Sequence, residues 1–80
     1  MVTYYVVQSF QRSAKKRLIA DTPQQLASAD QAMRTAKRLS ASKAYVVAFS
    51  RTGDQTTGDF DDAVVLVSYG EAPAELSDAA

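Results

Sequence analysis

Alternating hydrophobic and polar positions predict a β-strand near the start of the chain. Residues 3–11 would place two sets of side chains on opposite sides of an extended backbone. One set is Tyr4, Val6, Gln8 and Phe10, and the other is Thr3, Tyr5, Val7 and Ser9. The polar segment 11–16 predicts a hairpin connection, and residues 17–20 predict a short second strand.

A helix is predicted to begin directly after this second strand. Asp21 or Thr22 can act as the N-cap, Pro23 suits the first helical turn, and Gln25 follows Thr22 by three residues, as in a capping box. At 100° per residue, the apolar positions that follow fall on one side of a helix. They are Leu26, Ala29, Ala32, Met33, Ala36 and Leu39. We expect this stripe to be buried and the helix to end within residues 40–43.

Two further strands are predicted after the helix, over residues 44–50 and 62–69, because both segments are rich in β-branched and aromatic residues. Gly53-Asp54 and Gly58-Asp59 supply turn residues between them. The predicted order is ββαββ, an α+β fold with one amphipathic helix packed on a four-stranded antiparallel sheet. Residues 1–70 would form a single domain, and residues 71–80 a frayed acidic tail.

The alanine-rich stripe of the helix can approach a sheet closely, so we expect bulky sheet residues to face it. The residues predicted on this covered face are Tyr4, Val6, Phe10, Ile19, Tyr45, Val47, Phe49, Val65, Val67 and Tyr69. The opposite face would then expose an apolar set, namely Tyr5, Val7, Leu18, Val46, Val64 and Leu66.

One helix cannot cover both faces of the sheet, and an exposed apolar patch commonly marks an interaction surface. The sequence therefore predicts a protein-interaction module that forms a homo-oligomer, most simply a homodimer, through the uncovered face. Two other interpretations are open: a solvated face with scattered apolar residues, or pairing of sheet edges between protomers.

Composition argues against catalysis. The chain has 80 residues with neither cysteine nor histidine, so the commonest nucleophiles, general bases and metal ligands are missing. The carboxylates at 54, 59, 61 and 62 do not follow the spacing of a calcium-binding EF-hand loop, and solvated turn residues explain them better. We expect no enzyme activity, no cofactor and no small-molecule substrate. The lack of cysteine and of an export signal or a membrane-spanning segment predicts a cytoplasmic protein.

Charge is divided unevenly along the chain although the formal net charge is zero. Residues 1–51 carry nine cations and two anions, whereas residues 52–80 carry seven anions and no cation. Two basic clusters favour an alternative function in nucleic-acid binding. They are Arg12, Lys15, Lys16 and Arg17 in the hairpin, and Arg34, Lys37 and Arg38 on the helix. Stacking side chains would come from Tyr5, or from Tyr4, Tyr45 and Phe49 if the two faces of the sheet are exchanged.

Two family resemblances add to this interpretation. Residues 4–10, Tyr-Tyr-Val-Val-Gln-Ser-Phe, resemble the first strand of half of a sporulation-related repeat domain, a peptidoglycan-binding family, but the glycine before the serine and the second repeat are absent. Nearly the whole chain is similar to a group of small uncharacterised bacterial proteins with no assigned activity. The shared residues are 7–10, 20–21 with Pro23, 28–29, Ala36 with Leu39, 47–50, 53–54 and 58–60. This resemblance implies a compact bacterial domain and transfers no site residue.

Overall fold

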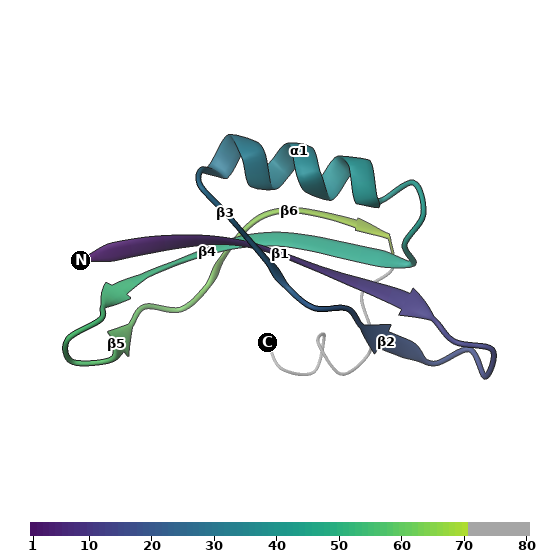
Figure 1. Ribbon diagram of the computed structural model, residues 1–80, viewed down its shortest axis with the longest axis horizontal. Helices are drawn as coiled ribbons and strands as arrows, with labels where there is room; N and C mark the ends of the chain where they lie inside the picture. The colour runs from purple at the N-terminus through teal and green to yellow at the C-terminus, as the bar shows by residue number, and fades with distance from the viewer. Residues whose placement is uncertain (71–80) are drawn as a thin grey trace.

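The computed structural model describes residues 1–70, which form one helix and a single curled antiparallel sheet of six strands (Figure 1). The strands are β1 (Val2–Arg12), β2 (Leu18–Ala20), β3 (Gln24–Leu26), β4 (Tyr45–Asp54), β5 (Asp59–Phe60) and β6 (Val64–Gly70), and the helix is α1 (Ala29–Leu39). The α+β class is therefore confirmed, whereas the predicted number of four strands is wrong. The acidic tail predicted over residues 71–80 lies outside the described residues.

Each edge of the sheet is an interrupted strand, which explains why six strands occur where four were expected. At the centre, β1 pairs with β4 through nine residue pairs, from Val2 opposite Gly53 to Phe10 opposite Tyr45. Both β2 and β3 pair with β1 on one side, and both β5 and β6 pair with β4 on the other. The interruption between β2 and β3 contains Pro23, which has no backbone N–H to donate to a ladder.

Gln8 bridges the gap between β2 and β3. Its Nε2 atom donates hydrogen bonds to the carbonyl oxygen of Asp21 at 2.6 Å and to that of Ser9 at 3.0 Å. The backbone N–H of Asp21 donates to the carbonyl of Ser9 at 2.9 Å. These bonds hold the chain against β1 where regular strand pairing stops, so the partly buried amide of Gln8 is satisfied.

The helix begins later than predicted, because a different capping box is used. Ser28 is the N-cap and its Oγ accepts a hydrogen bond from the backbone N–H of Gln31 at 3.2 Å. The side chain of Gln31 reaches back and accepts from the N–H of Ala27 at 3.2 Å. Residues 24–26 form strand β3 instead, where they gain backbone pairing with β1. The N-terminal start predicted at residues 21–23 is wrong, and the helix ends at Leu39, capped by Ser40, one residue before the predicted range of 40–43.

The helix packs on the face of the sheet that was predicted to be uncovered. The core consists of Val7, Val46 and Ala48 from the sheet and Ala32 and Ala36 from the helix, all at most 1% exposed. The assignment of faces is therefore wrong for most of the sheet. The physical reason is that the small side chains of Ala48 and of the neighbouring buried Ser9 let an alanine-rich helix approach closely, whereas the bulkier opposite face would hold it away.

The predicted faces are correct only in β2 and in the second half of β6. Val67 pairs with Ala48 and Tyr69 pairs with Val46, so both side chains lie on the helix side and pack against the core. An irregularity in the pairing at Ala48/Phe49 leaves Leu66 as the extra residue of β6. Beyond it the alternation is reversed, and Val65 pairs with Phe49 on the face opposite the helix.

Candidate interaction surface

The sheet face opposite α1, called the open face here, carries most of the aromatic side chains of the chain. Strand register places apolar residues from five strands on it, and Gln8, Gln25, Arg51 and Ser68 share the face with them. The apolar residues are Tyr4, Val6, Phe10, Leu18, Ala20, Tyr45, Val47, Phe49, Phe60 and Val65. Five of the seven aromatic residues of the chain belong to this set. Among residues 1–70, the only helix lies on the other side of the sheet, as Figure 1 shows.

Aromatic contacts organise both ends of the open face. The rings of Phe10 and Tyr45 lie 5.7 Å apart in a tilted arrangement, and Tyr45 is only 7% exposed. At the other end, the rings of Tyr4 and Phe60 are stacked with their centroids 5.8 Å apart. Paired aromatic rings lose little conformational entropy when they are covered, because they are already held in place. The open face is therefore a preformed surface.

Five of the six residues predicted on the interaction face are located on the helix side of the sheet. Val7 and Val46 are in the core, and Tyr5 and Leu66 pack against it. Val64 pairs with Ser50 on the helix side but is 60% exposed. Only Leu18 lies on the open face, through its pairing with Arg12. The alternation of large and small residues, Val7 with Ser9 and Val46 with Ala48, is the sequence signal that could have identified the helix side.

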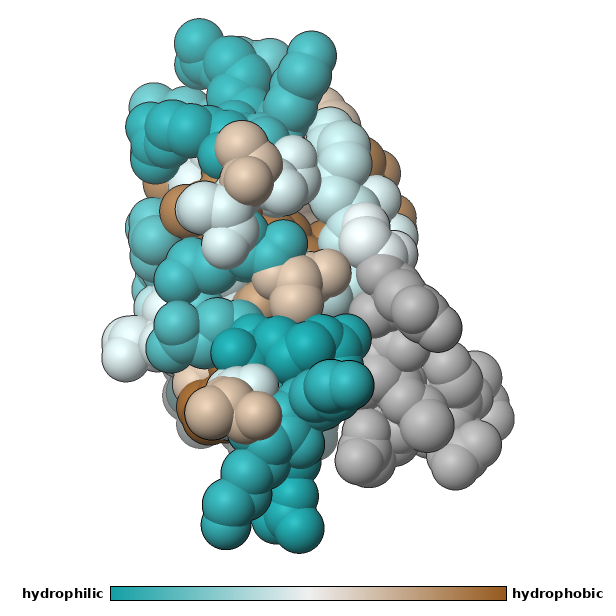
Figure 2. All heavy atoms as spheres, turned by 90° about the vertical axis from the view of Figure 1, so that its right-hand side faces the viewer, coloured by the Kyte–Doolittle hydropathy of each residue, from teal (hydrophilic) through white to brown (hydrophobic). Residues whose placement is uncertain are grey.

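A basic hairpin, residues 12–17, lies at one end of the open face. It carries Arg12, Lys15, Lys16 and Arg17. Ser13 organises the turn: its carbonyl accepts from the N–H of Lys16 at 2.9 Å, and its own N–H donates to the carbonyl of Arg17 at 2.8 Å. The guanidinium of Arg12 donates to the carbonyl of Lys16 at 3.0 Å. Figure 2 looks at this end of the molecule and shows its protruding lower part as hydrophilic.

An acidic turn, residues 54–62, lies at the opposite end. It carries Asp54, Asp59, Asp61 and Asp62. The Oδ1 atom of Asp54 accepts from the N–H of Thr56 at 2.8 Å, and the carbonyl of Asp54 accepts from Gly58 at 2.8 Å. Gln55 donates a hydrogen bond to the hydroxyl of Tyr4. These bonds attach the turn to the end of the open face.

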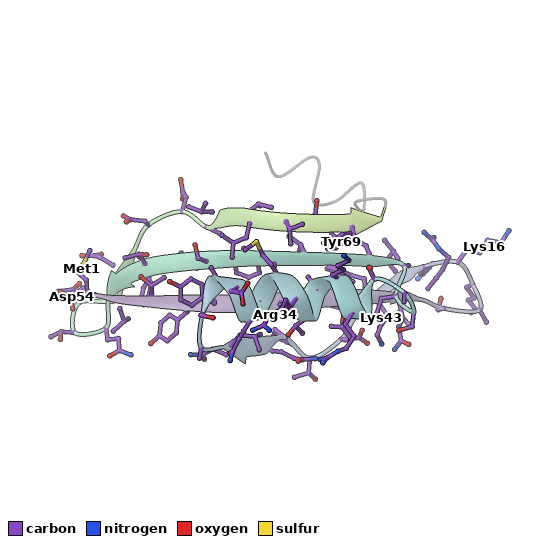
Figure 3. All side chains as sticks on the ribbon, turned by 90° about the horizontal axis from the view of Figure 1, so that it is seen from above. Met1, Lys16, Arg34, Lys43, Asp54 and Tyr69 are labelled. Atoms are coloured by element: carbon purple, nitrogen blue, oxygen red, sulfur yellow. The ribbon has the colours of Figure 1, made fainter. Side chains whose placement is uncertain are left out.

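Arg51 of β4 is a cation that contacts this acidic turn. Its guanidinium carbon lies 5.7 Å from the centroid of the Phe60 ring, and its Nε atom donates to the carbonyl of Asp61 at 3.3 Å. The acidic end therefore carries four carboxylates and one cation. Figure 3 shows the separation of the two ends, with Lys16 at one extreme of the molecule and Asp54 at the other. The longest dimension of the structure is 42 Å.

The two basic clusters proposed for nucleic-acid binding do not form one surface. The helix cluster lies above the sheet, whereas the basic hairpin extends beyond the end of α1 and toward the open face (Figure 1). Arg34 is also paired with Asp30 through an exposed contact of 2.9 Å between Nη2 and Oδ2. A shallow hollow beside the helix is lined by two arginines of the helix cluster, Arg34 and Arg38, and by Leu26, Gln31 and Thr35.

Within residues 1–70, no group of three or more acidic or other metal-ligating side chains is arranged to hold a metal ion. In the same part of the chain, α1 is too short and too polar to cross a membrane. No family model, curated protein or solved structure matches the chain.

Proposed function

We propose that this protein is a non-catalytic association module, acting in the cytoplasm, that self-associates through the open face of its sheet. The observation that carries this proposal is the concentration of aromatic and aliphatic side chains on a face without a covering helix. Apolar patches of this kind commonly mark protein contacts. Aromatic residues are also the residues that contribute most to binding at the centre of protein interfaces.

The size of the open face suits a dimer. Nine residue pairs of β1 and β4, with one flanking strand on each side, give a sheet area of roughly 600 Å² from standard strand spacings. A stable interface buries about 800 Å² per partner. The two charged ends beside the sheet supply additional area. Sheets that pack face to face are a common arrangement, with a layer of interdigitating side chains between them.

A matched pair of neighbouring residues tests this proposal. Val65 is 62% exposed and belongs to the open face, whereas Val64 is 60% exposed and belongs to the helix side. We expect Val65→Glu to weaken the dimer at least tenfold, because a carboxylate would be placed in an apolar interface. Val64→Glu should leave the dimer unchanged. The measurement is the solution mass by light scattering on a sizing column over a range of protein concentrations.

The same experiment separates the competing modes of association. Equal weakening by both glutamates would point to pairing of the exposed edge of β6, because both side chains flank that edge. A monomer at every concentration would contradict self-association. An intact dimer in the Val65→Glu variant would exclude the open face as the contact surface.

A second candidate function is the binding of single-stranded nucleic acid. The observation that favours it is that Phe10, Tyr45 and Phe49 adjoin the basic hairpin, whose Arg12 shares their face. Aromatic rings next to cations form the usual platform for stacked bases. The acidic turn at the far end of the face would repel a polyanion. This candidate predicts that a labelled single-stranded oligonucleotide binds with an affinity that falls steeply with salt, and that Phe49→Ala weakens it.

A further inference from the structure

We propose that the second copy packs on the open face in an antiparallel orientation, so that the basic hairpin of each protomer meets the acidic turn of the other. This inference rests on the proposed self-association and specifies its geometry. The two charged segments lie at opposite ends of the molecule, which is 42 Å long. In Figure 1 both ends of the sheet curve to the side away from the helix, so both charged segments flank the open face.

Charge distinguishes between two simple orientations of a two-fold dimer in which these sheets pack face to face. If the two-fold axis runs along the length of the sheet, the basic hairpin of one protomer lies over the basic hairpin of the other, so that four cations face four cations. If the axis runs across the sheet, each basic hairpin lies over the partner's acidic turn, which carries four carboxylates and Arg51. The first orientation is repulsive at both ends and the second is attractive at both.

The apolar centre and the charged ends have different roles in this arrangement. Exposed ion pairs contribute little free energy, so the aromatic centre of the face must supply most of the affinity. The charged ends select one orientation because the alternative brings like charges together. The resulting dimer has four layers, with the two sheets inside and one helix outside each of them.

The two charged segments are held by local hydrogen bonds and not by the dimer. Ser13 and Arg12 fix the hairpin, and Asp54 fixes the turn. Lys15, Lys16, Asp59 and Asp62 are themselves exposed. Their substitution therefore changes charge at the two ends without removing a core contact or a side-chain hydrogen bond among residues 1–70.

Charge reversal on the full chain tests the orientation. We expect Lys15→Glu combined with Lys16→Glu to raise the dimer dissociation constant about tenfold at low salt, since each change acts twice in a two-fold dimer. Its salt dependence should also be largely lost, because Arg12 and Arg17 then balance the two glutamates and leave the hairpin without net charge, whereas the wild-type dimer weakens as salt is added.

Distances between labels provide a second, independent test. The chain has no cysteine, so a single cysteine can be introduced and labelled without interference. Neutral positions are available in the hairpin at Ala14 and in the acidic turn at Thr56. With spin labels, Ala14→Cys should give a distance between protomers of about 40 Å, comparable to the length of the molecule. A mixture of Ala14→Cys and Thr56→Cys proteins should give a distance below about 20 Å, set by the spacing of stacked sheets.

The outcomes distinguish this inference from the proposed function. A dimer that keeps its dissociation constant after charge reversal, with a short distance between Ala14 labels, would overturn the antiparallel orientation and leave self-association standing. A monomer at all concentrations would overturn both. If removal of residues 71–80 converted such a monomer to a dimer, that acidic segment would be the occupant of the face in place of a second copy.

Discussion

The hydroxyl of Ser9 donates a hydrogen bond of 2.7 Å to the Oδ2 atom of Asp21, and the same oxygen is paired with the Nζ atom of Lys43 at 3.0 Å. Ser9 belongs to β1, Asp21 follows β2, and Lys43 follows the helix. The three side chains therefore join the interrupted edge of the sheet to the segment between α1 and β4. The contact is polar and only partly exposed, and it forms one side of the gap that Gln8 bridges.

This contact predicts a dependence of stability on pH. The hydrogen bond from Ser9, together with Lys43, holds the pKa of the Asp21 carboxyl below its usual value of 3.8. A group with a lowered pKa in the folded state stabilises the fold above its unfolded pKa and loses this effect as the pH falls through the folded value. Wild type should therefore unfold less readily than Asp21→Asn at pH 7, and the difference should shrink as the pH falls below 3.8 and through the lower pKa of the folded state.

Denaturant titrations at a series of pH values measure this difference. The matched control is Asp30→Asn, which removes a carboxylate from the exposed pair with Arg34, whose side chains are about three-quarters exposed. Exposed pairs of this kind contribute little, so the control should change the free energy of unfolding by less than about 0.5 kcal/mol. A constant gap between wild type and Asp21→Asn down to pH 2 would show that the charge of Asp21 does not stabilise the fold.

The cap of the helix gives a second prediction. Ser28→Ala should lower the free energy of unfolding by about 1 kcal/mol, because the backbone N–H of Gln31 loses its acceptor. Thr22→Ala should have little effect, since Thr22 lies ahead of β3 and outside the helix. The measurement is chemical unfolding followed by circular dichroism. The reverse ranking of the two variants would mean that the helix begins at Thr22 after all.

The burial of Val46 gives a third prediction. Val46→Ala should cost about 2 kcal/mol, because it opens a cavity between the sheet and Ala32 and Ala36 of the helix. Val64→Ala removes the same atoms from a side chain that is 60% exposed and should change stability by less than about 0.5 kcal/mol. Both values are to be measured at concentrations where the protein is monomeric. Similar losses of unfolding free energy in the two variants would contradict the position of the core between the helix and the face that carries Val46.

Gly53 gives a fourth prediction, at the point where β4 meets β5. A Cβ atom at this position would lie 2.5 Å from the carbonyl oxygen of Asp59 and from the ring of Phe60. Gly53→Ala should therefore displace the ring of Phe60 and cost about 1–3 kcal/mol. Shifts in the NMR signals of Phe60 and of the Arg51 Nε–H would report this displacement. The comparison is Gly58→Ala, where nothing lies within 4 Å and the cost of about 1 kcal/mol comes from its φ of 78° alone. Unchanged Phe60 signals in Gly53→Ala would contradict the close contact.

Several elements could be predicted from the sequence because their signals are local. The alternation from Tyr4 to Phe10 identifies β1, and the runs that contain Tyr45–Phe49 and Val64–Tyr69 identify the two long strands after the helix. The helix ends at Leu39, one residue before the predicted range of 40–43, and the β-rich run that follows it is the local signal for this end. Two capping patterns of the same type compete at its start, Thr22 with Gln25 and Ser28 with Gln31. The pairing of residues 24–26 with β1 decides between them, and that pairing is not local.

The open face shows the limit of sequence analysis for this protein. Alternation determined which side chains share a face in β1 and β4, because successive residues of a strand point to opposite sides, but the irregularity at Leu66 breaks this rule in β6. It could not determine which face the helix covers. That choice depends on the fit between Ala32 and Ala36 of the helix and Val46 and Ala48 of the sheet, which become neighbours only in the folded molecule. The positions of the charged segments at opposite ends were likewise decided by tertiary structure, because the lengths and pairing of β1 and β4 set where each hairpin turns.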